Sequence, residues 1–273
     1  HLGVFLSNDF FLSLNLGNIK NLLDSGKGKF YIYSGTLSGM NREILIGFLK
    51  EHEKVCPRSS LSRRFESKGG CFLCTHINRD TLLLISRMNG ARKSVDIGFA
   101  YPTMAEPDAY KPYVVAGFKA YAQIGVNEKE RIENIFDDAF SNGYDMVTVL
   151  AYGVPNIPPC YLDEALLSLR HGTGLVLGPL KNGKFYLIGM NTETHVILKE
   201  TMLVKHLDFE GPDNRKKVLR MIKSSGISCR ILPDWYTLKS FHDFKRLMRD
   251  TAKGIGWKAR WTRFVADNLA QPR

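Results

Sequence analysis

Three side chains able to bind a metal ion lie close together in the first third of the chain. Cys71 and Cys74 form a Cys-x-x-Cys pair, and His76 follows. With Cys56 they could supply the tetrahedral ligands of zinc, because thiolates at this spacing chelate one ion. Two small apolar side chains packed at a strand edge have the same spacing, and a single pair leaves the remaining ligands unspecified. We therefore expect no stoichiometric zinc.

The C-terminal tail combines basic residues with tryptophan, which suits contact with a nucleic acid. Between residues 239 and 273, Lys and Arg alternate with Trp257 and Trp261. Cations can contact a phosphate backbone while aromatic rings stack on bases. The candidate nucleic-acid contacts are Arg246, Lys258, Arg260, Trp261 and Arg263. A helix that packs its aromatic residues on the core and exposes its charges explains the same pattern, so both interpretations stay open.

A glycine-bearing loop near the N-terminus is a candidate phosphate site. The sequence predicts a strand over 30–33, a loop over 34–39 and a helix over 42–55. Backbone N–H groups and a helix N-terminus would face an anion in such a loop. Gly39 and Arg42 are the candidate contacts, and an ordinary connecting loop is the alternative.

The elements that must position these residues are those of an α/β protein. Short apolar runs predict strands over 95–101, 145–151, 174–178, 185–189 and 228–232. Helical periodicity predicts helices over 80–89, 128–140, 161–170 and 213–224. A strand, a helix and a strand in succession over 145–178 form a βαβ unit, which indicates an open, mostly parallel sheet. Residues 56–79 are interpreted as an exposed basic insertion.

Composition limits the class of protein. With 273 residues, 44% of them hydrophobic, the chain can bury one large core. The formal charge of +11 favours phosphate-bearing or otherwise anionic partners. The five Cys are irregularly spaced, which favours an intracellular, reducing compartment such as the cytoplasm or an organelle matrix. No apolar run has the length of a membrane span, so we expect no membrane association.

Several motifs resemble one known family. They are Gly143-Tyr144-Asp145, Val176-Leu177-Gly178-Pro179, Phe185 to Gly189, and Gln123 to Arg131. These motifs are similar to the bacterial GT-A-fold glycosyltransferase family of unknown substrate, the domain-of-unknown-function 2064 type, which is related to cofactor nucleotidyltransferases. The resemblance spans about residues 94–250. It implies a GT-A-like nucleotide-diphospho-sugar transferase domain over 1–250, with poor matches at 1–28 and 56–79, and a basic helical extension over 251–273.

The resemblance also implies where a nucleotide would bind. Its members are expected to hold a nucleotide diphosphate through a divalent metal on acidic side chains. The positions that match those acids are Asn127, Gly153, Asn182, Thr237 and Lys239, and none of them is a carboxylate. The resemblance therefore implies no metal site. The nucleotide contacts that it suggests are Gly39, Arg42, Gln123, Arg131, Gly153, Asn182 and Gly183.

Two functions follow from this pattern. The first is a catalytically degenerate relative that serves as a binding or scaffold protein, with RNA or a ribonucleoprotein as its anionic partner. The second is a metal-independent glycosyltransferase with a nucleotide-sugar donor, in which Lys184 or Lys239 neutralises the phosphates. In both cases we expect that Mg²⁺ or Mn²⁺ does not strengthen the binding of a nucleoside diphosphate.

Overall fold

The chain divides into two units, His1–Met40 and Asn41–Arg273. The computed structural model describes residues 2–6, 10–14, 32–33, 42–50, 69–91, 95–103, 116–181, 183–201 and 215–269. In the first unit, β1 (Leu2–Leu6) pairs antiparallel with β2 (Phe10–Leu14) and with β3 (Ile32–Tyr33). The strand predicted over 30–33 is therefore present, whereas Gly39 lies outside the described residues.

The second unit is built on a seven-stranded sheet of order β10-β8-β9-β7-β4-β5-β6. Its strands are β4 (Glu43–Phe48), β5 (Val95–Pro102), β6 (Lys119–Gln123), β7 (Met146–Leu150), β8 (Leu175–Pro179), β9 (Phe185–Asn191) and β10 (Cys229–Ile231). Strand β9 runs antiparallel to both of its neighbours, and every other pair in this sheet is parallel. The predicted mostly parallel α/β sheet is confirmed.

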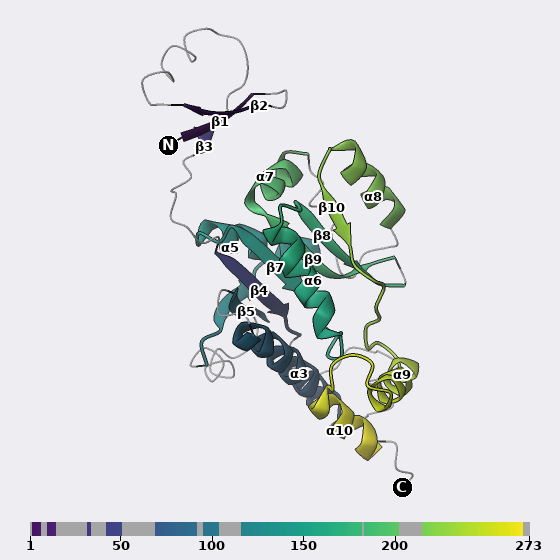
Figure 1. Cartoon of the computed structure of the whole chain (residues 1–273). Helices are drawn as coiled ribbons and strands as arrows, with labels where there is room; N and C mark the ends of the chain where they lie inside the picture. The colour runs from purple at the N-terminus through teal and green to yellow at the C-terminus, as the bar shows by residue number, and fades with distance from the viewer. Residues whose placement is uncertain are drawn as a thin grey trace. The chain divides into compact units, whose positions relative to one another are not determined.

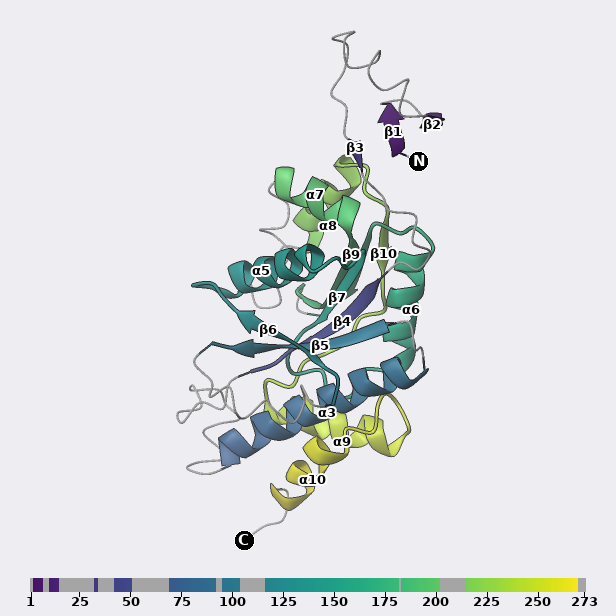
Figure 2. The ribbon, with the colours of Figure 1, turned by 90° about the vertical axis from the view of Figure 1, so that its left-hand side faces the viewer.

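Helices cover both faces of this sheet (Figure 1; Figure 2). They are α3 (Gly69–Ala91), α5 (Glu128–Ser141), α6 (Pro159–Arg170), α7 (Thr192–Glu200), α8 (Arg215–Ser224), α9 (Phe241–Ala252) and α10 (Arg260–Leu269). Helices α5, α7 and α8 contribute to one apolar cluster, and α3, α6 and α9 contribute to the other. Among the described helices, none combines the length and the apolar character that a membrane crossing requires.

The helix predicted over 42–55 is wrong, because β4 occupies the centre of the sheet there. Ile44, Leu45 and Ile46 are fully buried, and the strand pairs with β5 on one side and β7 on the other. A run of consecutive apolar residues that includes the β-branched Ile44 and Ile46 is typical of a strand that is covered on both faces. At Gly47, an added Cβ would lie 2.7 Å from the Ile85 side chain, so the glycine lets α3 pack closely on this strand.

The basic insertion predicted over 56–79 is also wrong in part, because its residues from Gly69 onward belong to α3. That helix continues through the segment predicted over 80–89. Leu82 and Ile85 face the core as expected, but Leu83 is 46% exposed. Strand β6 was not predicted from the sequence.

The periodic segments are confirmed in type and in the side chains that they bury. Helix α5 buries Ile132, Ile135, Phe136 and Ala139, and helix α6 buries Leu162, Ala165, Leu166 and Leu169. Strand β7, helix α6 and strand β8 follow one another as predicted, although β9 lies between the two strands in the sheet. The predicted basic tail is helical, with α9 and α10 separated by a short connection.

Candidate functional site

Six strands that run in the same direction end at one edge of the sheet, where open α/β proteins bind their ligands. The register places the ends of β4, β5, β6, β7, β8 and β10 on this carboxyl edge, together with the turn that leads from β8 into β9. Lys50 follows β4, Gln123 ends β6, and Gly153 follows β7. Residues that are far apart in sequence therefore meet here.

Lys50 is the cation at the end of the central strand. The Asn78 side chain donates from Nδ2 to the Lys50 carbonyl at 2.9 Å and accepts at Oδ1 from the Lys50 N–H at 3.3 Å. The Lys50 ammonium lies 5.7 Å from the centroid of the Tyr152 ring. Sequence reasoning missed Lys50 because it placed this segment in a helix. A strand over 43–48 would have put the lysine at the carboxyl edge.

Gln123, a candidate nucleotide contact, has a structural role at this edge. Its buried amide donates from Nε2 to the carbonyl of Leu49 at 2.7 Å and to that of Ala100 at 2.8 Å. The Leu49 carbonyl lies just past the end of β4, and the Ala100 carbonyl, inside β5, also accepts the Leu49 N–H at 2.9 Å. The amide therefore joins β4, β5 and β6 and leaves this nitrogen no proton for a ligand.

The motif around Arg131 shapes the loop between β6 and α5. Asn127 caps α5 by accepting the Glu130 N–H at 3.0 Å, and the Glu130 carboxylate accepts the Val126 N–H at 3.0 Å. Arg131 donates from Nε to the Gly125 carbonyl at 3.1 Å. Gly125 has φ +140°, and an added Cβ would lie 2.7 Å from the Glu130 Cβ, so only glycine fits. These side chains are engaged within the loop.

Two positions that the family resemblance would fill with acids lie side by side. The Leu238 N–H donates to the Gly153 carbonyl at 2.8 Å, so the segment before α9 passes over the loop after β7. A Cβ built on Gly153 would lie 3.8 Å from the Cβ of Thr237, an ordinary contact distance. The structure thus places Gly153 and Thr237 next to each other, and neither residue is a carboxylate.

Tyrosine hydroxyls hold this crossing segment in place. Tyr186 donates its hydroxyl to the Pro233 carbonyl at 3.0 Å, and Asn156 donates from Nδ2 to the Tyr236 hydroxyl at 2.6 Å. Burial is the largest cause that raises the pKa of Tyr186 and of Tyr236 above the ordinary value of a phenol. Both phenols are therefore neutral at physiological pH and act as hydrogen-bonding groups, not as bases.

The nearby carboxylates have other partners. Asp243 accepts the N–H groups of Lys239 and Ser240 at 3.0 and 2.7 Å and thereby caps α9. Asp234 pairs with Arg215 at 3.1 Å. Within the described ranges, no three His, Cys, Asp or Glu side chains come together in a group that could hold a metal ion.

Lys184 and Lys239, the candidate catalytic residues, lie on segments that reach the same edge. Lys184 is in the turn between β8 and β9, where its carbonyl accepts the Leu180 N–H at 2.7 Å. Gly183, next to it, has φ +81°, as expected of the predicted hairpin turn. Lys239 is exposed and directly precedes the cap of α9. Asn182 lies outside the described residues.

Arg42 was expected in a phosphate loop, but the structure places it at the opposite edge. Because β4 begins at Glu43, Arg42 lies at the amino end of the sheet. Its guanidinium lies 4.6 Å from the centroid of the Tyr144 ring and donates from Nη1 to the Asn142 carbonyl at 3.0 Å. The helix that was predicted to begin at Arg42 is therefore wrong, because a strand begins there and Arg42 precedes its first residue. Contact between Arg42 and a nucleotide stays a prediction.

The cysteine motif lies on a helix. Tyr152 donates its hydroxyl to the Cys74 Sγ at 3.3 Å, whereas the His76 ring packs 6.0 Å from that of Trp261. Two residues that are two positions apart on a helix point about 200° away from each other, so Cys74 and His76 do not converge. The Cys71 side chain and Cys56 lie outside what is described. The absence of zinc stays a prediction.

The basic tail docks on α3 through its tryptophan. Asp80, which is 1% exposed, accepts the N–H groups of Trp261 at 3.3 Å and Thr262 at 2.7 Å. The Arg79 guanidinium lies 3.6 Å from the centroid of the Trp261 ring. One face of this ring is therefore covered from within the protein.

The other candidate nucleic-acid contacts differ in exposure. Arg246 lies 3.8 Å over the Tyr236 ring and pairs with Asp250 at 3.4 Å, so its guanidinium is engaged within the fold. Lys258, Arg260 and Arg263 are exposed. Contact between these three cations and RNA stays a prediction.

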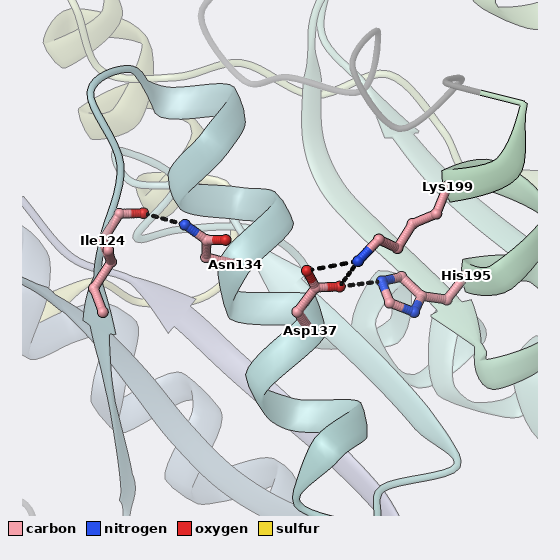
Figure 3. Close-up of polar contacts among 5 residues, drawn as sticks. All are labelled: Ile124, Asn134, Asp137, His195 and Lys199. Atoms are coloured by element: carbon pink, nitrogen blue, oxygen red, sulfur yellow. Dashed lines mark hydrogen bonds and ion pairs between the residues drawn. The ribbon is translucent and has the colours of Figure 1, made fainter.

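A polar cluster on the other face of the sheet joins α5 to α7 (Figure 3). Asp137 lies 2.9 Å from the Nε2 of His195 and 2.8 Å from the Nζ of Lys199. Burial lowers the pKa of His195 below its ordinary value, although the neighbouring Asp137 acts in the opposite direction. The His195 ring also stacks on Phe140 at 4.5 Å. This cluster fastens α7 to the domain.

Comparisons with known proteins agree with the fold. Residues 87–202 match the family described as "Uncharacterized protein conserved in bacteria (DUF2064)". The crystal structure of a protein from Desulfovibrio desulfuricans G20, provisionally described as a nucleotide-diphospho-sugar transferase, is similar with a TM-score of 0.67 and 20% identity. The alignment covers 84% of this chain and 97% of that one.

More distant structures also match. A cytidylyltransferase from Leptospira borgpetersenii serovar Hardjo-bovis (strain JB197) is 11% identical with a TM-score of 0.49, covering 84% of this chain and 94% of that one. No curated protein matches this sequence. The likeness to the Desulfovibrio structure confirms the α/β fold class, and the family match confirms the resemblance that the motifs indicated.

Proposed function

We propose that the chain is a relative of the uncharacterized bacterial proteins named DUF2064, whose model residues 87–202 match, and that it has a nucleotide-diphospho-sugar transferase-like fold but has lost its metal-binding acids. In this proposal it serves as a binding or scaffold protein for anionic partners. The observation that carries the proposal is the pairing of Gly153 with Thr237 at the carboxyl edge. We infer that two acids at these positions could share one cation, whereas Gly153 and Thr237 carry no charge.

The missing charge matters because of what a divalent cation requires. Mg²⁺ binds oxygen ligands, with one or two carboxylates in a typical nucleotide site. Such a metal neutralises the charge that develops on a departing diphosphate. Gly153 and Thr237 supply no negative charge, and Asp243 is engaged in capping α9. In this proposal, a metal-dependent transfer reaction lacks carboxylate ligands among the residues of this edge that the structure describes.

We propose that a nucleoside diphosphate or its sugar binds at the same edge without a metal. We assign the phosphate-binding role to Lys50, since Asn78 fixes its backbone at the end of β4. A charge-assisted hydrogen bond between an ammonium and a phosphate oxygen is stronger than a neutral one. The lysine replaces part of the positive charge that a metal would supply.

Calorimetric titration with nucleoside diphosphates and their sugars, with and without Mg²⁺ or Mn²⁺, tests the proposal. We expect equal affinity in both conditions and weaker binding by Lys50→Met. The double variant Gly153→Asp and Thr237→Asp restores two facing acids, and we expect it to gain metal-dependent binding. Asp is among the residues that tolerate the left-handed backbone of Gly153, at φ +86°. Metal-dependent micromolar binding by the unaltered protein would contradict the loss of the site.

A metal-independent glycosyltransferase is the second candidate. It is favoured by the placement of Lys184 and Lys239 on segments that reach the carboxyl edge. In this case the lysines stabilise the diphosphate leaving group directly. Release of nucleoside diphosphate from a nucleotide sugar in the presence of a chelator, lost in Lys184→Met or Lys239→Met, would favour this function over the scaffold role.

The macromolecular partner that we propose is RNA or a ribonucleoprotein. Its support is the formal charge of +11, since a phosphate backbone attracts such a chain over long range. Binding of a labelled RNA that weakens steeply as salt rises is the expected result. An absence of RNA binding at low salt would contradict this part of the proposal without affecting the nucleotide site.

A further inference from the structure

Helix α8 has the most one-sided charge of the described helices. Its ten residues include five Lys or Arg and no acid. Lys216, Lys217, Arg220 and Lys223 are exposed, whereas Val218 and Ile222 are 1% and 3% exposed. The helix is therefore anchored to the domain by its apolar side and presents its cations to solvent. This basic face of α8 is defined by those four exposed residues.

The charge arrangement on α8 opposes helix formation. Lys216 and Arg220 are four positions apart and Arg220 and Lys223 are three apart, so like charges are neighbours on the helix surface. Lys216 and Lys217 also lie in the first turn, at the positive end of the helix dipole, and no acid lies in that turn. A local arrangement that conflicts with the stability of its own element is expected at functional sites.

Among the described residues, partners within the protein do not neutralise this face. Arg215, beside it, pairs with Asp234 at 3.1 Å, and Arg220 donates from Nε to the Lys216 carbonyl at 3.3 Å. Across the part of the chain that the structure describes, no carboxylate pairs with the four cations of the basic face. Helix α9 differs, since its Arg246 pairs with Asp250.

We propose that the basic face of α8 binds the phosphate backbone of RNA. This inference rests on the proposed RNA partner and moves its contact surface from the C-terminal tail to α8. Lys216, Arg220 and Lys223 form a row of about 10 Å along the helix. Because α8 has no aromatic residue, the contacts are with phosphates and do not depend on base sequence.

An anionic membrane is the other surface that attracts a basic helix, but α8 does not fit it. Helices that bind at a membrane interface insert an apolar face among the lipids. On α8 that face is already used, because Val218 and Ile222 are buried and Leu219 and Met221 pack against the same apolar cluster. Figures 1 and 2 show α8 near α7 and β10 at one end of the sheet. The exposed cations of α8 can therefore contact phosphates, but the helix has no free apolar face to insert into lipid.

Fluorescence anisotropy with a labelled single-stranded oligouridylate RNA, measured over a range of salt concentrations, tests the assignment. The variant Lys216→Ala, Arg220→Ala and Lys223→Ala removes three cations from the basic face. We expect its affinity to fall by about tenfold or more and the log-log salt slope to decrease by about two, at 0.7 per phosphate contact for a single strand. Alanine favours helix and the removed charges repel each other. The melting temperature should therefore not fall.

The matched control is Lys258→Ala, Arg260→Ala and Arg263→Ala in the C-terminal tail, which removes the same charge from another site. We expect this control to retain its affinity and its slope. If instead the control loses RNA binding while the α8 variant keeps it, the tail is the contact surface and the α8 assignment is overturned. Binding to phosphatidylserine vesicles without binding to RNA overturns it as well. If the unaltered protein binds no RNA, the proposed RNA partner is wrong. If it binds RNA but the α8 variant keeps that binding, only the assignment to α8 is wrong.

Discussion

Two carboxylates each hold one helix against the domain, on opposite faces of the same sheet, and they do so by different chemistry. Asp80 in α3 is 1% exposed and holds α10 through two backbone N–H groups. The Asp137 side chain in α5 is 31% exposed and holds α7 through His195 and Lys199. The first attachment depends on acceptor oxygens in an apolar environment, whereas the second depends on charged side chains near solvent.

This difference predicts opposite responses to pH. Burial is the largest cause that raises the pKa of Asp80 above its ordinary 3.8, because the hydrogen bonds from α10 only partly compensate. Burial lowers the pKa of His195 below its ordinary 6.5. Protonation therefore favours the folded state at Asp80 and disfavours it at His195. The variants below test whether the two attachments are independent.

The largest effect is expected from Asp80→Ala. The substitution leaves the N–H groups of Trp261 and Thr262 without an acceptor, which should cost about 2 kcal/mol of unfolding free energy. Urea denaturation measures the loss, and hydrogen exchange of α10 shows whether that helix detaches first. Asp80→Asn keeps one acceptor oxygen and should cost less. Equal losses in the two variants would show that the charge, not the acceptor, holds α10.

A comparison of the unaltered protein with Asp80→Asn tests the direction of the Asp80 pKa shift. Since its pKa is higher in the folded state than the ordinary 3.8, the folded state binds the proton more tightly. The stability of the unaltered protein relative to Asp80→Asn should therefore increase as the pH falls toward 4. A relative stability that decreases over this range would contradict the dominance of burial over the α10 hydrogen bonds.

Trp261→Ala should have the next largest effect. It removes the contact with Arg79, whose guanidinium lies 3.6 Å from the ring centroid, and exposed cation–π contacts contribute about 0.5–1 kcal/mol. We expect a lower melting temperature and unchanged RNA affinity. Arg260→Ala, at an exposed neighbour, should leave both unchanged. A loss of RNA binding without a change in melting temperature would favour base stacking by the tail.

Protonation of His195 should lower the stability of the protein at mildly acidic pH. Its folded-state pKa is depressed, so between that value and 6.5 the unfolded state binds more protons, and stability falls as the pH decreases. Melting temperatures from pH 7.5 to 5 measure this loss. His195→Gln cannot titrate and should show a shallower dependence. If both proteins follow the same curve, the acid sensitivity arises elsewhere.

The smallest effect is expected from Lys199→Ala. The Lys199 side chain is 44% exposed, so loss of its ion pair with Asp137 should cost no more than about 0.5 kcal/mol and less at high salt. Lys199 also lowers the pKa of His195 by repulsion. Its removal should raise the folded-state pKa of His195 toward 6.5, so the pH range over which His195 lowers stability becomes narrower. An unchanged pH range would separate Lys199 from the titration of His195.

Local periodicity was sufficient for the elements whose burial repeats regularly. Helices α5 and α6 were predicted with the correct inward residues because apolar side chains recur at helical spacing on one face. The motif resemblance was also correct over residues 87–202. Residues 43–48 were assigned to a helix because a short, continuous apolar run has no period that distinguishes a buried strand from a buried helix. That error concealed Lys50 and misplaced Arg42.

The sequence by itself determined the α/β class, the strands β5, β7, β8, β9 and β10, and the absence of a carboxylate at positions such as Gly153, because these follow from residue types and local spacing. Only the tertiary structure placed Gly153 beside Thr237 and gave Trp261 a partner in α3. The Asp80 carboxylate meets the Thr262 N–H across 182 positions of sequence. Such a contact leaves no local pattern, because it depends on how strands pair and on which face of the sheet each helix returns to.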